Sequence, residues 1–179
     1  MGNLLTTRTA PPPKIVEIAP GCFRLRVPFY IFFFDVGTHV NFLRLSNGKF
    51  LVLSAVTLDA DTKEQVDTLT CNGELIEALV ATNPFHTTAF PQWIDMYPSL
   101  AKGKMFGTPR HLRMFPEIPW AGSTADEQVH KLWEPEVSMR IPAGCEFNDP
   151  KPELTNHFNG VIALYHASRI VICVSIYSL

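Results

Sequence analysis

The sequence lacks the features of proteins that bind nucleic acid or span a membrane. Its formal net charge is −2 and it contains no run of basic residues, so we expect no nucleic-acid partner. The longest run of apolar side chains, Phe29 to Phe34, is closed by Asp35 after six residues, whereas a membrane-spanning helix needs about 20. We therefore expect no membrane span, and we predict a buried strand over this run.

Cysteine pairs and secretion signals are also missing. The four cysteines are far apart and form no Cys-x-x-Cys pair, which argues against both a zinc knuckle and a dense disulfide framework. No Asn-x-Ser/Thr sequon occurs, and the N-terminus lacks the long apolar core of a signal peptide. These absences favour an intracellular, cytoplasmic protein with reduced thiols.

Two common catalytic motifs are absent as well. No glycine-rich phosphate loop is present, which argues against nucleotide use. Ser168 follows His166 closely but does not lie in a Gly-x-Ser-x-Gly turn, so serine hydrolysis has almost no support. Any catalytic chemistry of this protein is therefore expected to depend on other residues.

The N-terminal stretch MGNLLT matches the pattern for N-myristoylation, with Gly2 exposed after removal of Met1 and Thr6 at the required offset. The other interpretation is a chance match to a loose pattern in a flexible leader. No polybasic patch follows, and a single acyl chain anchors a protein only marginally.

The 179 residues suit one globular domain, because 46% are hydrophobic and 18% are charged. We expect a flexible leader over residues 1–13, which ends in three prolines, and a single domain over residues 14–179. Apolar residues alternate with arginines from Phe23 to Val27, and Asn47-Gly48 is a strong hairpin signal. The first third is therefore predicted to be a meander of antiparallel strands over 15–18, 23–27, 40–45 and 50–53.

The pattern changes after Asp59 to that of an α/β protein. Asp61 and Thr62 are predicted to cap a helix that stops at Asn72-Gly73. The segments 75–82, 90–97 and 105–108 then spell strand, helix and strand, which is typical of a parallel crossover. Residues 109–148 are predicted to form a long, partly helical insertion, and 161–165 and 170–176 the last strands.

Three histidines lie at or just beyond the ends of predicted strands and are the candidate metal ligands: His86, His111 and His166. Ligands of open α/β sheets bind outside the carboxyl ends of the strands, and three imidazoles with an open position suit Zn or Fe. His166 joins the other two only if its strand runs in the same direction as theirs. The competing interpretation is three ordinary loop histidines. Surface roles are expected for the remaining histidines: His39, His130 and His157.

The order of these elements resembles the N-terminal half of the metallo-β-lactamase fold, an αββα sandwich. The resemblance rests on LSNGKFLVLSA, on ELIEALVATNPFHTTAF and on the helix-strand unit that follows, and it covers residues 14–172. An Asn-Pro-Phe-His turn, a Tyr-Pro helix end and the stretch GTPRH resemble a divergent branch of the family whose activity is uncharacterised.

Catalytic members of the family carry a His-x-His-x-Asp-His loop after this strand, which binds up to two metals. The stretch from Asn83 to Thr88 supplies only His86 and no aspartate. The resemblance therefore implies a degenerate metal site with little or no hydrolase activity in a protein that binds an unidentified small molecule or protein. The alternative is a mononuclear metal-dependent hydrolase that uses the three histidines.

The C-terminal stretch IVICVSIYSL stops where the family fold would continue with further helices and strands. We therefore expect a shortened gene product. Val174-Ser175 can be encoded by GTAAGT, a typical intron start, so the final residues are interpreted as read-through of an unspliced intron.

Overall fold

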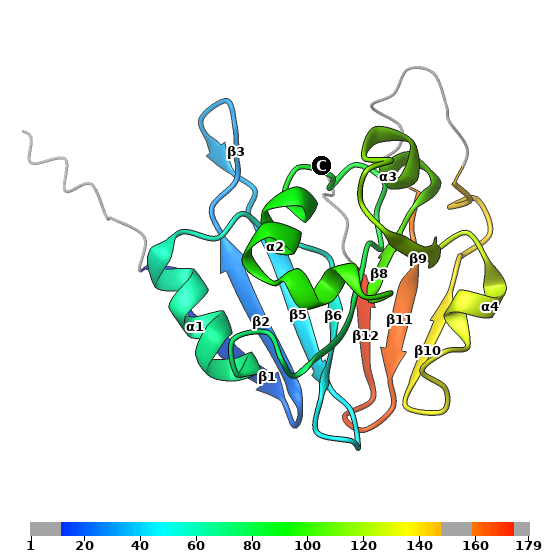
Figure 1. Ribbon diagram of the computed structural model, residues 1–179, viewed down its shortest axis with the longest axis horizontal. Helices are drawn as coiled ribbons and strands as arrows, with labels where there is room; N and C mark the ends of the chain where they lie inside the picture. The colour runs from blue at the N-terminus through cyan, green and yellow to red at the C-terminus, as the bar shows by residue number, and fades with distance from the viewer. Residues whose placement is uncertain (1–11, 148–158, 174–179) are drawn as a thin grey trace, which may run out of the picture.

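A mixed seven-stranded sheet forms the centre of the computed structural model, which describes residues 12–147 and 159–173 (Figure 1). Strands β6 to β9 are mutually parallel, while β1, β2, β5 and β6 are antiparallel neighbours. The order across the sheet is β1 (Ile15–Ala19), β2 (Cys22–Val27), β5 (Thr38–Arg44), β6 (Phe50–Leu53), β7 (Ile76–Val80), β8 (Met105–Gly107) and β9 (Trp120–Ser123). The predicted meander and parallel crossover are thus confirmed.

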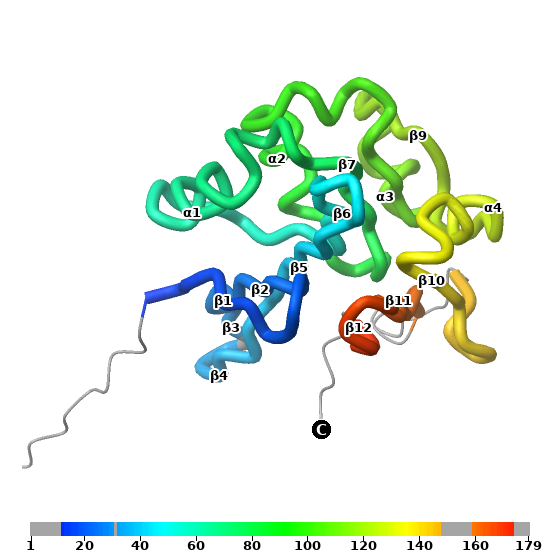
Figure 2. The backbone as a smooth tube through the Cα atoms, turned by 90° about the horizontal axis from the view of Figure 1, so that it is seen from below, coloured from blue at the N-terminus to red at the C-terminus, as the bar shows by residue number. Residues whose placement is uncertain are grey.

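A second sheet and a set of short helices complete the layers. The second sheet is antiparallel and comprises β10 (Val137–Arg140), β11 (Ile162–Tyr165) and β12 (Ile170–Cys173). The helices are α1 (Ala60–Thr70), α2 (Phe90–Met96), the 3₁₀ turn η1 (Pro98–Ala101), α3 (Pro109–Met114) and α4 (Glu127–His130). Figure 2 shows α1 and α2 on one face of the main sheet and β10–β12 on the other. The described residues therefore supply helix, sheet and sheet layers, in agreement with the expected α/β (α+β) class.

Two apolar cores lie on the two faces of the main sheet, and β6 contributes to both. Phe50 and Val52 pack under the helices, with Trp93 among their neighbours, whereas Leu51 and Leu53 face the second sheet. All four β6 residues are buried, as expected for a central strand that is covered on both faces. This double burial explains why the segment is an unbroken apolar run.

Helix α1 begins two residues earlier than the sequence suggested. Asp59 is the N-cap: its carboxylate accepts a hydrogen bond from the backbone N–H of Thr62 (2.8 Å), and the Thr62 hydroxyl accepts one from the Asp59 N–H (2.9 Å). The prediction that Asp61 caps the helix was therefore wrong, because Asp61 already lies inside the first turn. The helix ends at Cys71, which adopts a left-handed conformation before Asn72-Gly73.

The predicted buried strand over Phe29 to Phe34 was also wrong. Residues Tyr30–Ile31 (β3) and Phe34–Asp35 (β4) form a small antiparallel hairpin that projects from the sheet (Figure 1). The ladder between β2 and β5 ends at the pair Val27 and Thr38, so the residues between them leave the sheet. Phe32 and Phe33 are 92% and 81% exposed.

Residues 109–147 are partly helical, as predicted, but they also add strands to both sheets and are not a separate insertion over the sheet. Strand β9 extends the main sheet in parallel with β8, and β10 forms an edge of the second sheet. Strand β9 has four residues and no alternation of polar and apolar side chains, so periodicity could not reveal it. Strand β10 does alternate over its four residues, and this short signal was missed. Of the helices in the described residues, none has both the length and the apolar content needed to cross a bilayer.

We predict that Asp59→Ala lowers the free energy of unfolding by about 1 kcal/mol, because the reciprocal hydrogen bonds at the start of α1 are lost. Urea denaturation monitored by circular dichroism measures the change. Asp61→Ala removes the same charge from the same turn without removing the cap, and it serves as the matched control. Equal destabilisation by both substitutions would contradict the assigned cap.

Candidate functional site

The carboxyl ends of the parallel strands β6, β7 and β8 form one edge of the main sheet, where α/β proteins place their sites. Buried polar side chains gather in the segments that follow these strands. They are Ser54, Thr82, Asn83, Thr87, Thr108 and His111. We call this the β7–β8 edge. His86 lies in the loop beyond β7 and is half-buried.

Asn83 shapes the loop that carries His86. Its Oδ1 accepts a hydrogen bond from the backbone N–H of Phe85 (2.8 Å), which closes a turn around Pro84. Its Nδ2 donates to the backbone oxygen of Asn159 (3.2 Å), which leads into the second sheet. Both polar atoms of the Asn83 amide therefore hold the loop in place. The same hydrogen bonds determine the position of His86.

His111 is completely buried, and hydrogen bonds occupy both of its ring nitrogens. Nε2 lies 2.9 Å from the carbonyl oxygen of His86, and Nδ1 lies 2.7 Å from Oγ1 of Thr108. A carbonyl oxygen only accepts, so Nε2 carries the hydrogen and Nδ1 accepts from the Thr108 hydroxyl. The imidazole thus joins the start of α3 to the loop after β7, and neither nitrogen has a lone pair available to a metal.

The surroundings of His111 keep it neutral. Phe90 and Trp120 contact its ring edge-on, with centroids 4.6 and 5.9 Å away. The pKa of His111 falls from 6.5 to about 4. Burial is the largest cause, the hydrogen bond to the His86 backbone opposes it, and the nearby charges of His86 and Arg110 add to the lowering. The neutral form agrees with the hydrogen bonds assigned to the two nitrogens.

His166 lies at the opposite edge of the molecule. Strand β11 starts at the β7–β8 edge, where Val161 N–H donates to the Thr82 carbonyl oxygen (2.8 Å), and it runs away from that edge (Figure 1). Each strand residue advances the chain by about 3.3 Å, so its four residues carry it about 13 Å away. The exposed His166 there pairs through Nε2 with Ser138 Oγ (2.8 Å). His166 therefore does not lie at the same edge as His86 and His111, because its strand runs away from that edge.

The residues of the β7–β8 edge do not fit a catalytic metal ion. Across residues 12–147 and 159–173, no group of three or more His, Cys, Asp or Glu side chains could hold a metal. The start of the second sheet also packs closely on this edge: a Cβ atom at Gly160 would lie 2.9 Å from the Thr82 carbonyl oxygen. The structure brings His86 and His111 together through a backbone contact.

Sequence reasoning missed the residues that organise this edge. Thr108 caps α3 and bonds His111, and the signal was present as a threonine followed by a first-turn proline in GTPRH. His130 was expected at the surface but is buried, with Nε2 2.8 Å from the Thr124 carbonyl oxygen. His39 is half-buried, and His157 lies outside the described residues.

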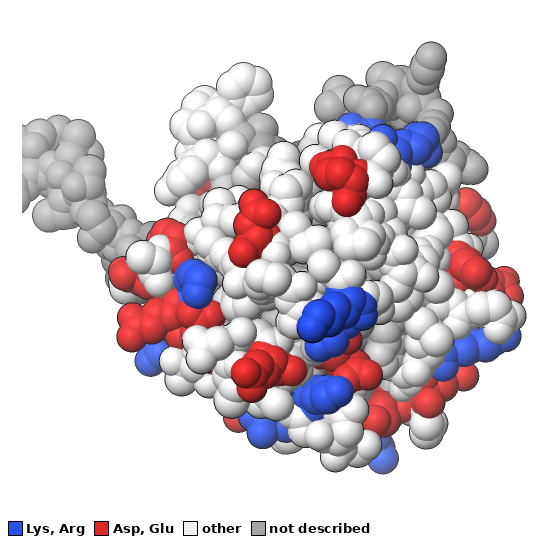
Figure 3. Space-filling model, in the orientation of Figure 1, with Lys and Arg blue, Asp and Glu red and all other residues white. Residues whose placement is uncertain are grey.

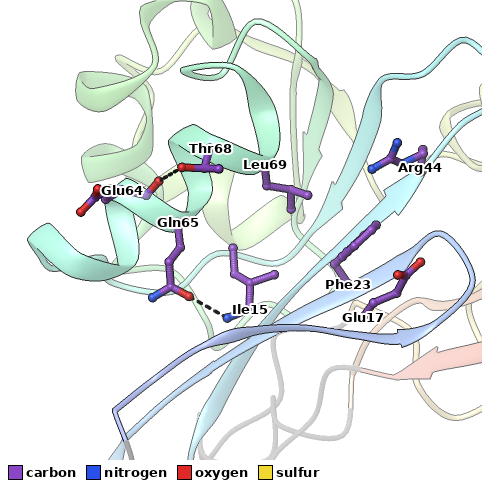
Figure 4. A pocket seen from close by; sticks show the side chains of 8 residues that line it. All are labelled: Ile15, Glu17, Phe23, Arg44, Glu64, Gln65, Thr68 and Leu69. Carbon is purple, nitrogen blue, oxygen red and sulfur yellow. Dashed lines mark hydrogen bonds between the residues drawn. The ribbon is translucent and has the colours of Figure 1, made fainter.

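A separate groove of about 530 Å³ lies between α1 and strands β1, β2 and β5 (Figure 4). Ile15, Phe23 and Leu69 form its apolar wall, and the Arg44 guanidinium lies over the rings of Phe23 and Phe50 at 5.5 and 5.1 Å. Its remaining lining residues are Glu17, Glu64, Gln65 and Thr68. None of these lining side chains is a histidine or cysteine, so the groove does not contain a Ser–His or Cys–His pair.

Comparison with known proteins gives structural matches only. No protein-family model matches the sequence, and no curated protein sequence matches it. A metallo-β-lactamase from Hirschia baltica superposes with a TM-score of 0.60 at 15% identity, over 89% of this chain and 69% of that chain. The DIM-1 metallo-β-lactamase gives 0.59 at 14% identity, over 89% and 68%. The metallo-β-lactamase FIM-1 from Pseudomonas aeruginosa, in its mono-zinc form, gives 0.53 at 10% identity, over 85% and 64%.

These matches show that the chain has the metallo-β-lactamase fold, as the resemblance in the sequence implied. At such low identities the likeness concerns the fold and carries no activity. The chain spans about two thirds of the length of these three proteins.

We predict that the buried neutral His111 makes the protein acid-sensitive. Its pKa is lower in the folded state, so its contribution is complete above pH 6.5 and is lost as the pH falls towards about 4, by roughly 3 kcal/mol. His111→Gln keeps an amide that can donate to the His86 carbonyl and removes the titration. Its free energy of unfolding is therefore expected to fall less between these pH values than that of the wild type.

His166→Gln is the control for this experiment, because it replaces an exposed histidine at the other edge. Urea denaturation across the pH range should give wild-type behaviour for this variant. If all three proteins lost stability equally on acidification, the assignment of a buried neutral His111 would be wrong.

Proposed function

We propose that this chain is a non-catalytic protein with the metallo-β-lactamase fold, in which the edge used elsewhere for metal ligands has a structural role. The observation that supports the proposal most directly is the engagement of both His111 ring nitrogens in hydrogen bonds. A histidine binds a metal through a lone pair on one nitrogen, and in this arrangement Nδ1 uses its lone pair to accept from Thr108.

The energetic argument points in the same direction. To bind a metal, the His111 ring would have to break its bonds to Thr108 and His86 and leave its position between Phe90 and Trp120. Each hydrogen bond contributes about 1 kcal/mol, and a buried partner left unsatisfied costs about 1–3 kcal/mol more. The binding free energy of a metal there would therefore have to exceed the stability lost when these hydrogen bonds and ring contacts break.

His86 alone cannot replace the missing ligands. Catalytic zinc is held by three protein ligands and keeps a fourth position for water, and two-metal sites need more. No aspartate lies between Asn83 and Thr88, and the described residues assemble no third ligand around the loop. Without such a set, water is not brought to a reactive pKa, so hydrolysis of lactams, thioesters or phosphodiesters is not expected.

A binding or scaffold role is consistent with the rest of the molecule. The fold retains two packed cores and the groove beside α1, whose lining contains no histidine or cysteine. The partner is proposed to be a small molecule or a protein. The protein would use the fold as a rigid support and not as a catalyst.

We predict that purified protein contains far less than one zinc or iron ion per chain and shows no saturable Zn²⁺ binding by titration calorimetry. His86→Ala should not change the metal content, because His86 is not expected to be a ligand. His166→Ala is the matched control, since it removes an imidazole from the opposite edge. Near-stoichiometric metal that is lost in His86→Ala, but kept in His166→Ala, would overturn the proposal in favour of a mononuclear metal-dependent hydrolase.

We also expect no catalysed hydrolysis when Zn²⁺ is supplied. The substrates are a chromogenic β-lactam, a thioester and a phosphodiester. Each should be hydrolysed at the same rate in the presence of Zn²⁺ and wild-type protein as in the presence of Zn²⁺ and the His111→Gln variant. A higher rate for the wild type that disappears in this variant would assign His111 to catalysis, contrary to the proposal.

A further inference from the structure

The hairpin formed by β3 and β4 is the most exposed apolar feature among the described residues. Phe32 and Phe33 at its turn are 92% and 81% exposed, and Tyr30 and Phe34 beside them are 62% and 63% exposed. Figure 3 shows the hairpin as a projection without charged side chains above its base. Large exposed apolar features of this kind mark sites of interaction with proteins or membranes.

The hairpin is exposed on both of its faces and at its tip. Tyr30 pairs with Asp35, and Ile31 pairs with Phe34, so Tyr30 and Phe34 point to opposite faces of the two-stranded ribbon. Their exposed fractions are nearly equal. A groove on a protein partner, or the flat face of a second copy, would cover one face, whereas a lipid surface surrounds a projecting tip on all sides.

The base of the hairpin is polar and firmly held. Asp35 accepts hydrogen bonds from the backbone N–H groups of Phe29 (3.0 Å) and Gly37 (2.9 Å), and from the Arg26 guanidinium (2.9 Å). These bonds hold the pKa of Asp35 below its usual value, with the Phe29 N–H making the largest contribution. The Arg26 guanidinium packs over Gly37, where a Cβ atom would lie 2.5 Å from its Nε. The hairpin therefore has an apolar tip and a base that carries the charged pair Arg26 and Asp35.

From these features we infer that the β3–β4 hairpin docks the protein on a phospholipid surface by inserting its aromatic tip at headgroup level. Tyrosine concentrates at this level of a bilayer, and segments that lie in the interface bury phenylalanine side chains at the boundary between headgroups and acyl chains. Strands of two residues leave many backbone groups unpaired, which the hydrocarbon interior does not tolerate but the hydrated interface does. The insertion is therefore shallow and reversible, and the Arg26–Asp35 pair stays in water.

The experiment is flotation of the purified full chain with phosphatidylcholine vesicles. The protein is produced without an N-terminal acyl group, so that binding reports the hairpin and not the pattern at Gly2. We expect the wild type to float with the vesicles and to do so equally well at high salt, because the interaction is apolar. In Phe32→Asn/Phe33→Ser the partition coefficient should fall about tenfold or more, since two exposed rings no longer leave water.

Two features of this variant make the result interpretable. Phe32 has a positive φ of 56°, a conformation that asparagine tolerates better than phenylalanine, so the variant should fold as well as the wild type. Leu132→Ser/Val171→Ser removes exposed apolar side chains elsewhere (56% and 63% exposed) and is the matched control that should bind like the wild type.

Three outcomes would overturn the inference. The wild type could fail to float, or the tip variant could float as well as the wild type. Alternatively, the wild type could form a dimer by analytical ultracentrifugation that dissociates in the tip variant, which would assign the hairpin to contact between two copies of this chain.

Discussion

The double burial of β6 and β7 is the constraint on which the rest of the architecture depends. Apart from the half-buried Glu77, the side chains on both faces of these strands are apolar, so neither face can remain in water. Helices α1 and α2 cover one face, and the second sheet covers the other. The parallel pairing of the same strands places their carboxyl ends at one edge, and this edge then receives the loops that carry His86 and His111.

The β7–β8 edge lies where α/β proteins place their active sites, but its hydrogen bonds connect segments of the fold to one another. Thr108, His111 and the His86 carbonyl form a continuous hydrogen-bonded chain between α3 and the loop after β7. In the same loop, Asn83 donates a hydrogen bond to the carbonyl oxygen of Asn159, which precedes β11 of the second sheet. In a site built for a metal, the imidazoles would present lone pairs to a shared point. Here Thr108 and the His86 carbonyl oxygen occupy both nitrogens of His111. The same position in the fold therefore holds α3 against the loop after β7.

The exposed hairpin shows that apolar content alone does not determine burial. Its six-residue run is more apolar than most strands of the core, yet the ladder between β2 and β5 closes before it and leaves it outside the sheet. It rises from the same edge as the candidate site in Figure 1. The exposed residues of the hairpin thus belong to neither of the two cores.

Local patterns in the sequence determined most of the element order and part of the site. Alternation over Phe23–Val27, the Asn47-Gly48 turn and the strand-helix-strand order over 75–108 specified antiparallel strands, a hairpin and a crossover, because these signals arise between near neighbours in the chain. The position of His86 and His111 after parallel strands followed from the same reasoning. The direction of β11, the exposure of Phe32 and the partners of the His111 nitrogens were decided only by the tertiary structure. The direction of β11 and the partners of His111 depend on segments far apart in the sequence, such as Thr82 with Val161 or His86 with His111. The exposure of Phe32 follows from the point where the β2–β5 ladder ends, and periodicity carries no information about either.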